Sequence, residues 1–178
     1  MERLWAPWRM QYIGGKQKPG CLFERVIEHP DDEDAGLVVW RPQGAIVLLN
    51  KFPYNPGHAM VAPIAHKASL EELDDAESAD LIGAVRRTFT VLRSVMKPDG
   101  LNAGVNVGTA AGAGIPDHVH FHVVPRWNGD TNFMAVLAET RVISQHLEET
   151  YAILRPHFER FANGDGRGGA APGARPPA

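Results

Sequence analysis

The sequence predicts a single α+β domain, an antiparallel sheet of about five strands with two main helices. Three observations lead to this fold class. The apolar segments are mostly short and rich in β-branched or aliphatic residues, as strands are. Connections of hairpin length join several of them, which favours antiparallel pairing. One long segment with a helical apolar period separates the strands into two groups, and a second helical pattern follows the last strand.

The bulk composition excludes several classes of protein. The chain has 178 residues, 44% hydrophobic and 22% charged, as in one ordinary globular domain. Its formal net charge of −3 offers no basic field to a nucleic-acid backbone. No apolar run approaches the roughly 18 residues that span a bilayer, and the N-terminus lacks a signal-peptide pattern. A single cysteine, Cys21, excludes an intrachain disulfide and favours a cytoplasmic location. We therefore expect no nucleic-acid partner and no membrane partner.

The first part of the chain is expected to hold an arm, a short helix and three strands. Residues 1–13 carry Trp5 and Trp8 without a clean period, which suggests an arm that packs on a partner subunit. The next predicted elements are a short helix over Cys21 to Glu28, a charged, solvated turn over Asp31 to Gly36, and strands over Leu37 to Trp40, Ala45 to Leu49 and His58 to Ile64. Pro42 to Gly44 reads as a hairpin turn. Two prolines make Asn50 to Gly57 a loop.

The remaining elements are two helices and two strands. The strongest helix is predicted over Glu77 to Lys97, and Pro98 and Gly100 end it. Its apolar stripe is predicted to contain Leu81, Ile82, Val85, Phe89, Leu92 and Met96. Strands are expected over Leu101 to Val107 and Val119 to Pro125, and a helix over Val142 to Phe161. Residues 1–162 thus form one domain, and residues 163–178, which lack large apolar side chains, form a disordered tail.

Three histidines in one segment carry the functional information. His118, His120 and His122 alternate with apolar residues in the sequence DHVHFHVVPRW. On a strand, residues two apart share a face and lie about 6.7 Å from one another, so the three imidazoles would form a comb. Only eight histidines occur in the chain, which makes this spacing improbable by chance.

Two chemistries use such a comb. The imidazoles can hold a transition metal, as in cupin-like sites. Alternatively, one neutral imidazole can attack phosphorus while its neighbours orient it and donate to phosphate oxygens. The preceding loop, Asn106 to Gly114, has little side-chain bulk, so its backbone N–H groups can approach an anion closely. A phosphate beside the comb explains this loop, whereas a bare metal site does not.

The pattern from His118 to Val124 resembles the signature of the histidine triad family. Asn50 to Pro63 is similar to the first conserved block of that family, and Asn106 and Gly108 fall where its loop residues lie. These similarities cover most of residues 37–127. The segments RLWAPWRM, AGAGI and HVVPRW further resemble a bacterial branch that includes diadenosine tetraphosphate phosphorylases.

The resemblance implies a role for each matching residue. His120 would be the nucleophile and form a covalent nucleotidyl-imidazole intermediate. His122 would donate to the α-phosphate, His58 would touch the phosphate or assist its orientation, and His118 would support the comb. The implied substrate-binding residues are Asn50 for a ribose hydroxyl, Leu48 near the base, and Asn106, Gly108, Gly112, Gly114 and Ile115 for the phosphates.

The resemblance also implies the partners. The substrate would be a purine nucleotide or a dinucleoside polyphosphate, and the protein would be a homodimer. No metal would be required for catalysis, although Mg²⁺ can accompany the substrate. Other functions stay open at this point: a dinucleoside polyphosphate or nucleoside phosphoramidate hydrolase, a nucleotide-binding sensor with little turnover, and a cupin-type metal oxidoreductase.

The sequence departs from the commonest family pattern in two places. The loop before the triad reads Gly112-Ala113-Gly114, where Gln followed by Ser or Thr is usual, so the leaving-group contacts differ. Many bacterial members bind zinc through Cys-x-x-Cys and two later histidines. Here the matching residues are Cys21, Glu24, His66 and His118. Either these four hold a structural zinc remote from the chemistry, or Cys21 is a small buried thiol.

Overall fold

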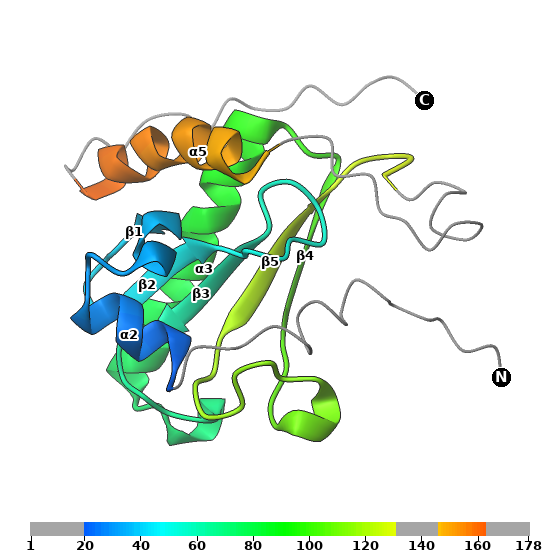
Figure 1. Ribbon diagram of the computed structural model, residues 1–178. Coiled ribbons are helices and arrows are strands. Elements are labelled where there is room, and N and C mark those ends of the chain that lie inside the picture. The colour runs from blue at the N-terminus through cyan, green and yellow to red at the C-terminus, as the bar shows by residue number, and fades with distance from the viewer. Residues whose placement is uncertain (1–19, 131–145, 163–178) are drawn as a thin grey trace, which may run out of the picture.

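The computed structural model describes residues 20–130 and 146–162. One antiparallel sheet of five strands, in the order β1-β2-β3-β5-β4, forms its centre (Figure 1). Its strands are β1 (Val38–Trp40), β2 (Ala45–Leu49), β3 (Ala59–Pro63), β4 (Gly100–Val105) and β5 (Phe121–Arg126). The predicted fold class is therefore confirmed. The N-terminal arm and the tail lie outside the described residues.

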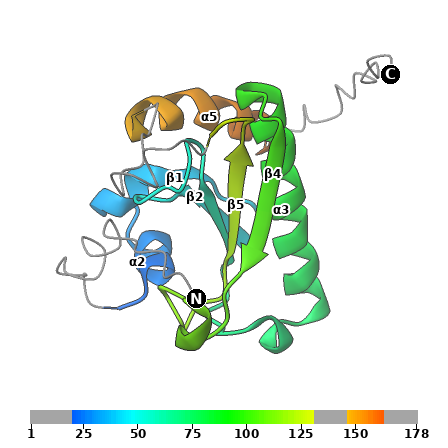
Figure 2. The same ribbon diagram turned by 90° about the vertical axis from the view of Figure 1, so that its right-hand side faces the viewer.

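Helices cover both faces of the sheet, and the side chains of the central strands alternate between them. Figure 2 shows α2 on one side of the strands and α3 on the other. On β2, Val47 and Leu49 pack toward α3, while Ile46 and Leu48 pack in the cluster that contains α2 residues. All residues of β2 and β3 are buried, as expected for strands covered on both faces. We call the two sides the α3 face and the α2 face.

The α3 face holds the larger apolar core. Its helices are α3 (Asp75–Met96) and α5 (Leu147–Ala162). A capping box begins α3, in which the Asp74 carboxylate accepts from the Glu77 N–H and the Glu77 side chain accepts from the Asp74 N–H. One residue of the predicted stripe is wrong, because the Ile82 side chain is 47% exposed. Val91 is buried instead, one turn before the end of the apolar stripe.

The α2 face is covered by shorter elements. Helix α2 (Leu22–Glu28) agrees with the predicted short helix and is followed by the 3-10 helix η1 (Glu33–Leu37). The prediction of a solvated acidic turn is wrong at Asp34. This side chain lies 3.0 Å from Arg25 Nη2 and 3.2 Å from Lys51 Nζ. The two cations explain why a carboxylate is buried there.

The strand that was predicted to carry the three histidines begins later than expected. β5 starts at Phe121, so His118 and His120 lie in the segment that leads into the strand, and only His122 lies within it. Short 3-10 helices, η2 (Leu70–Glu72) and η3 (Thr109–Ala111), interrupt the connections before α3 and before β5. Among the described residues, no helix is long and apolar enough to cross a bilayer.

Candidate active site

His122 is placed on the α2 face by its register in the sheet. It pairs with Met60 of β3 and with Gly104 of β4, and Met60 belongs to the α2-face cluster. Its Nδ1 lies 3.0 Å from His58 Nε2. His58 is buried and accepts a hydrogen bond at Nδ1 from the backbone N–H of Tyr54, at 3.0 Å.

These contacts select the tautomers of the two rings when both are neutral. Because His58 Nδ1 accepts from a backbone N–H, its proton must be on Nε2, from which it donates to His122 Nδ1. His122 then carries its proton on Nε2. Both nitrogens of His58 are thus engaged within the protein. Of the two roles expected for His58, this geometry favours orienting His122 over touching a phosphate.

His120 is held with its other nitrogen ready for attack. Its Nδ1 donates to the backbone carbonyl of His118 at 2.8 Å, which leaves the lone pair on Nε2. Burial lowers the pKa of His120, and the bond to the His118 carbonyl offsets part of this effect. Its ring meets the His122 ring edge to face, with centroids 4.9 Å apart. A neutral, oriented imidazole beside a second N–H donor is the arrangement that nucleophilic attack on phosphorus requires.

The side chain of His118 belongs to a second cluster. Its Nε2 lies 2.9 Å from the carbonyl oxygen of Pro63 and its Nδ1 lies 3.3 Å from the Cys21 Sγ. His66 packs beside it with ring centroids 5.2 Å apart, and His66 Nδ1 contacts a carboxylate oxygen of Glu24. The structure thus brings Cys21, His66 and His118 together, and Glu24 reaches the group only through its contact with His66.

The donor atoms of this cluster fit a metal ion. Those of Cys21, His66 and His118 lie within 4.8 Å of one another, and in the described part of the chain no other trio of such side chains converges in this way. The His118 tautomer fits too, because a proton on Nε2 leaves the Nδ1 lone pair toward the thiol. Without a metal, burial raises the pKa of Cys21 and lowers that of His118.

The His118 side chain faces the cluster, as expected, but its backbone lies against His120. The backbone carbonyl of His118 accepts from His120 Nδ1, while the His118 side chain contacts Cys21. The Phe23 ring also lies next to both histidines, at 4.9 Å from His118 and 5.1 Å from His120 between centroids. Phe23 had no signal in the sequence beyond its place two residues after Cys21.

The small-residue loop before the histidines uses part of its backbone internally. The N–H groups of Gly112 and Ala113 donate to the carbonyls of Thr109 and Gly108, at 3.0 and 3.2 Å. Gly108 and Gly112 have φ of +77° and +87°, values that favour glycine. The amides of Gly114 and Ile115 therefore remain the better candidates for an anion cradle. Asn106 is half-buried just after β4.

The expected nucleoside-binding residues lie near each other at the end of β2. Leu48 is 1% exposed and packs within the α2-face cluster, so other side chains cover it in this structure. The Asn50 side-chain oxygen accepts from the Phe52 N–H at 2.8 Å, which turns the chain into the loop. Its amide NH₂ is the group that could reach a ribose hydroxyl.

The loop between β2 and β3 contributes residues that the sequence did not single out. Tyr54 stacks on His58 with centroids 4.7 Å apart, in addition to its backbone bond to that ring. Asn55 Nδ2 donates to the Pro125 carbonyl at 2.9 Å and to Asp130 at 2.8 Å. The loop is thus fastened to the far end of β5, which keeps His58 in place against His122.

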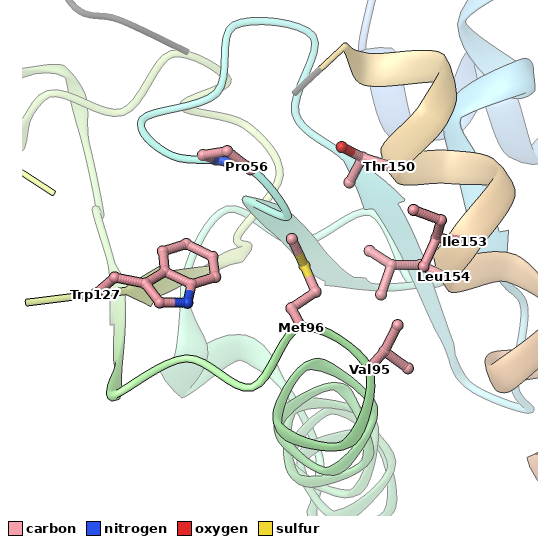
Figure 3. A pocket seen from close by; sticks show the side chains of 7 residues that line it. All are labelled: Pro56, Val95, Met96, Trp127, Thr150, Ile153 and Leu154. Atoms are coloured by element: carbon pink, nitrogen blue, oxygen red, sulfur yellow. The ribbon is translucent and has the colours of Figure 1, made fainter. Parts of the chain in front are cut away.

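A cavity of about 390 Å³ lies beside α3 and α5, and none of its described lining residues is a histidine (Figure 3). It is lined by Pro56, Val95, Met96, Trp127, Thr150, Ile153 and Leu154. Most of these residues come from α3 and α5, and Leu154 belongs to the α3-face core. This apolar cavity offers none of the histidine chemistry.

The model of the HIT domain matches residues 32–129, a range that contains His58, His120 and His122. The chain belongs to the histidine triad (HIT) family. It is an enzyme of the histidine triad type, a family of nucleotidyltransferases and hydrolases. The cupin-type oxidoreductase is thereby set aside.

One relative matches nearly the whole chain, and others match most of it. A Mycobacterium tuberculosis protein named AP-4-A phosphorylase is 38% identical over 169 residues, which span 90% of this chain and 86% of the relative. An asymmetrical bis(5′-nucleosyl)-tetraphosphatase of Schizosaccharomyces pombe is 31% identical over 134 residues, 73% of this chain and 69% of that protein. A histidine triad nucleotide-binding protein of Sulfolobus tokodaii superposes with a TM-score of 0.66 at 27% identity, covering 84% of this chain and all of its own.

Proposed function

We propose that this enzyme cleaves diadenosine tetraphosphate through a covalent nucleotidyl-histidine on His120, with inorganic phosphate as the second acceptor. The carrying observation is the pair of oriented rings. His120 presents the Nε2 lone pair because its Nδ1 donates to the His118 carbonyl. His122 presents an N–H because His58 donates to its Nδ1. A nucleophile and a donor for the phosphate oxygen therefore lie side by side.

The reaction would proceed in two displacements at one phosphorus. In the first, His120 Nε2 attacks the α-phosphorus, a P–N bond forms, and the bond from that phosphorus to the bridging oxygen breaks to release ATP. In the second, an oxygen of inorganic phosphate attacks the same phosphorus and the P–N bond breaks, which gives ADP and restores His120. The His122 N–H and the amides of Gly114 and Ile115 would stabilise charge on the phosphoryl oxygens in both steps. No step requires a bound metal, and Mg²⁺ would accompany the polyphosphate.

Phosphate is favoured over water as the acceptor by the loop and by one relative. Gly112, Ala113 and Gly114 leave room for a dianion, which gains charge-assisted hydrogen bonds from N–H donors that water does not match. The M. tuberculosis relative is named a phosphorylase. The S. pombe relative is named a tetraphosphatase, so hydrolysis is the second candidate, and the same first step would serve it.

Product analysis at rising phosphate concentration tests the proposal. Diadenosine tetraphosphate is incubated with the protein, and the nucleotides are separated by ion exchange. We expect ATP and ADP in equal amounts, with a rate that rises with phosphate. ATP and AMP at all phosphate concentrations would make the protein a hydrolase. A sensor would give neither product and no covalent adenylyl adduct on His120.

We further propose a structural zinc held by Cys21, Glu24, His66 and His118. It would cross-link α2 to the segments around Pro63 and His118 and hold the Cys21 thiolate, chemistry that a thiol alone does not supply. Metal analysis of the purified protein and of Cys21→Ser tests this site. One equivalent of zinc in the first and a strong reduction in the second are expected.

Two proposals concern the whole protein. We propose a homodimer, with Trp5 and Trp8 as candidate interface residues from the sequence, and a monomer in sedimentation at micromolar concentration would contradict it. The cytoplasmic location remains a prediction from the single cysteine and the composition. Cell fractionation would test that location.

A further inference from the structure

We propose that Phe23 is a positioning residue, whose ring holds the His120 imidazole in the orientation that attacks phosphorus. This inference rests on the proposed function of His120 as the nucleophile. It concerns a residue of α2, a helix that contributes no group to the chemistry itself. The Phe23 side chain is fully buried and its ring contacts the rings of both His118 and His120.

The hydrogen bond to His120 is not sufficient to hold its ring. The Nδ1–H bond to the His118 carbonyl restrains one atom, and the imidazole can still tilt about that contact. The Phe23 ring meets the His120 ring at 46°, with centroids 5.1 Å apart, a common aromatic geometry. It meets the His118 ring at 47° and 4.9 Å. One rigid plane therefore sets the relative position of the nucleophile and of the residue whose carbonyl orients it.

The Phe23 ring can hold the His120 ring in a fixed position because α2 itself is fastened to the rest of the domain. Val26, on the same helix, is fully buried, and its carbonyl accepts from Arg41 Nη2 at 2.5 Å. Arg25 forms an ion pair with the buried Asp34 at 3.0 Å. Among the described residues, the other ring that touches His120 belongs to His122, which is expected to bind substrate and so changes its contacts during turnover. The Phe23 ring is fully buried.

A purely structural role is the competing explanation, and the chain offers a matched control. Phe158 is also a buried phenylalanine, at 1% exposure, and it stacks on Trp40 with centroids 5.9 Å apart. It lies in the α3-face core, a cluster that contains none of the histidines. Phe23→Leu and Phe158→Leu remove the same atoms from two buried sites, and only the first borders the nucleophile.

The experiment compares the two variants in substrate-free and turnover measurements. Nitrogen-15 NMR of the histidine rings reports which nitrogen of His120 carries the proton, with no substrate present. Phe23→Leu is expected to weaken the Nδ1–H tautomer signature and to lower kcat on the order of 100-fold while KM changes little. Both variants are expected to lower the melting temperature by similar amounts, because each loses the same buried atoms. Phe158→Leu is expected to retain the wild-type tautomer and kcat.

Several outcomes would overturn the proposal. A Phe23→Leu enzyme with the wild-type tautomer and kcat would show that the ring only fills space. Equal losses of kcat and of the tautomer signature in both variants would point to general destabilisation. Should Phe23→Leu fail to fold, Phe23→Met repeats the test, and failure of both would make the role structural. The NMR result does not depend on diadenosine tetraphosphate being the substrate, so it separates this proposal from the proposed function.

Discussion

The two faces of the sheet differ in the side chains that the same strands bury on each side. On the α3 face, Val47, Val61 and Leu92 pack in an almost wholly apolar core. On the α2 face, His58, His118 and His120 are buried close to an apolar cluster, and each has a hydrogen-bond partner. A buried polar group is costly unless it is paired, so the α2 face must be more exactly arranged. We infer that the apolar α3 face contributes most of the stability, whereas burying the histidines on the α2 face lowers it.

The largest effect is expected at the nucleophile. His120→Ala should lower kcat by about four orders of magnitude or more, because the variant lacks the proposed nucleophile of the covalent intermediate. Binding of the nucleotide should be largely kept, since the imidazole acts mainly in the transition state. Single-turnover kinetics and calorimetric titration measure the two quantities. Retention of more than about a tenth of the activity would rule out the covalent mechanism.

A core residue of the α3 face should show the opposite pattern. Leu92 is fully buried on α3, so Leu92→Ala should reduce the free energy of unfolding by about 2–5 kcal/mol. Its kcat, measured well below the melting temperature, should stay close to that of the wild type. Denaturant unfolding and steady-state assays give both values. A large loss of kcat in fully folded Leu92→Ala would contradict the assignment of stability to one face and catalysis to the other.

Substitution of His58, which donates to His122, should have an intermediate effect on kcat. His58→Leu removes the bond that fixes the His122 tautomer, and we expect kcat to fall by about 10²–10³-fold, as for loss of one transition-state donor. His58→Gln is the matched variant, because its side-chain NH₂ can still donate to His122 Nδ1. It should recover part of the lost activity. Equal activity of the two variants would argue against the relay through His58.

The buried histidines should also make stability depend on pH. Burial lowers the pKa of both His118 and His120, whereas both return to about 6.5 in the unfolded chain. Their contribution to stability is full above about pH 6.5 and is lost as the pH falls toward the lower folded values, because the unfolded state binds the protons first. Denaturant midpoints measured with a chelator present should fall on acidification. The fall should be smaller in His120→Ala, and an equal fall would contradict this assignment.

The smallest effect is expected at the C-terminus. Removal of residues 163–178 should leave the melting temperature and kcat unchanged, because that segment has no large apolar side chain to bury. This expectation comes from composition alone and concerns residues outside those described. A substantial drop in melting temperature would show that the segment packs on one of the two faces.

Much of the architecture followed from local patterns in the sequence. The short aliphatic segment predicted β2, the period of 3.6 residues predicted α3, and the alternation of histidines with apolar residues predicted a strand near β5, because all three are properties of neighbouring residues. The same alternation, with the resemblance to the histidine triad family, led to His120 and His122. Element ends were less accurate, as at β5, because strand ends depend on pairing with residues elsewhere in the chain.

Only the tertiary structure decided how the histidines are held. Cys21 and His118 meet across 97 positions of sequence, and Phe23 reaches the nucleophile from a helix near the other end of the domain. Asp34 is buried because Arg25 and Lys51 converge on it, although its sequence neighbours suggested a solvated turn. The tautomers of His58 and His120 likewise depend on the backbone groups that face each ring. Sequence determines which side chains are available, but proton positions and ring orientations depend on distances between atoms that only folding brings together.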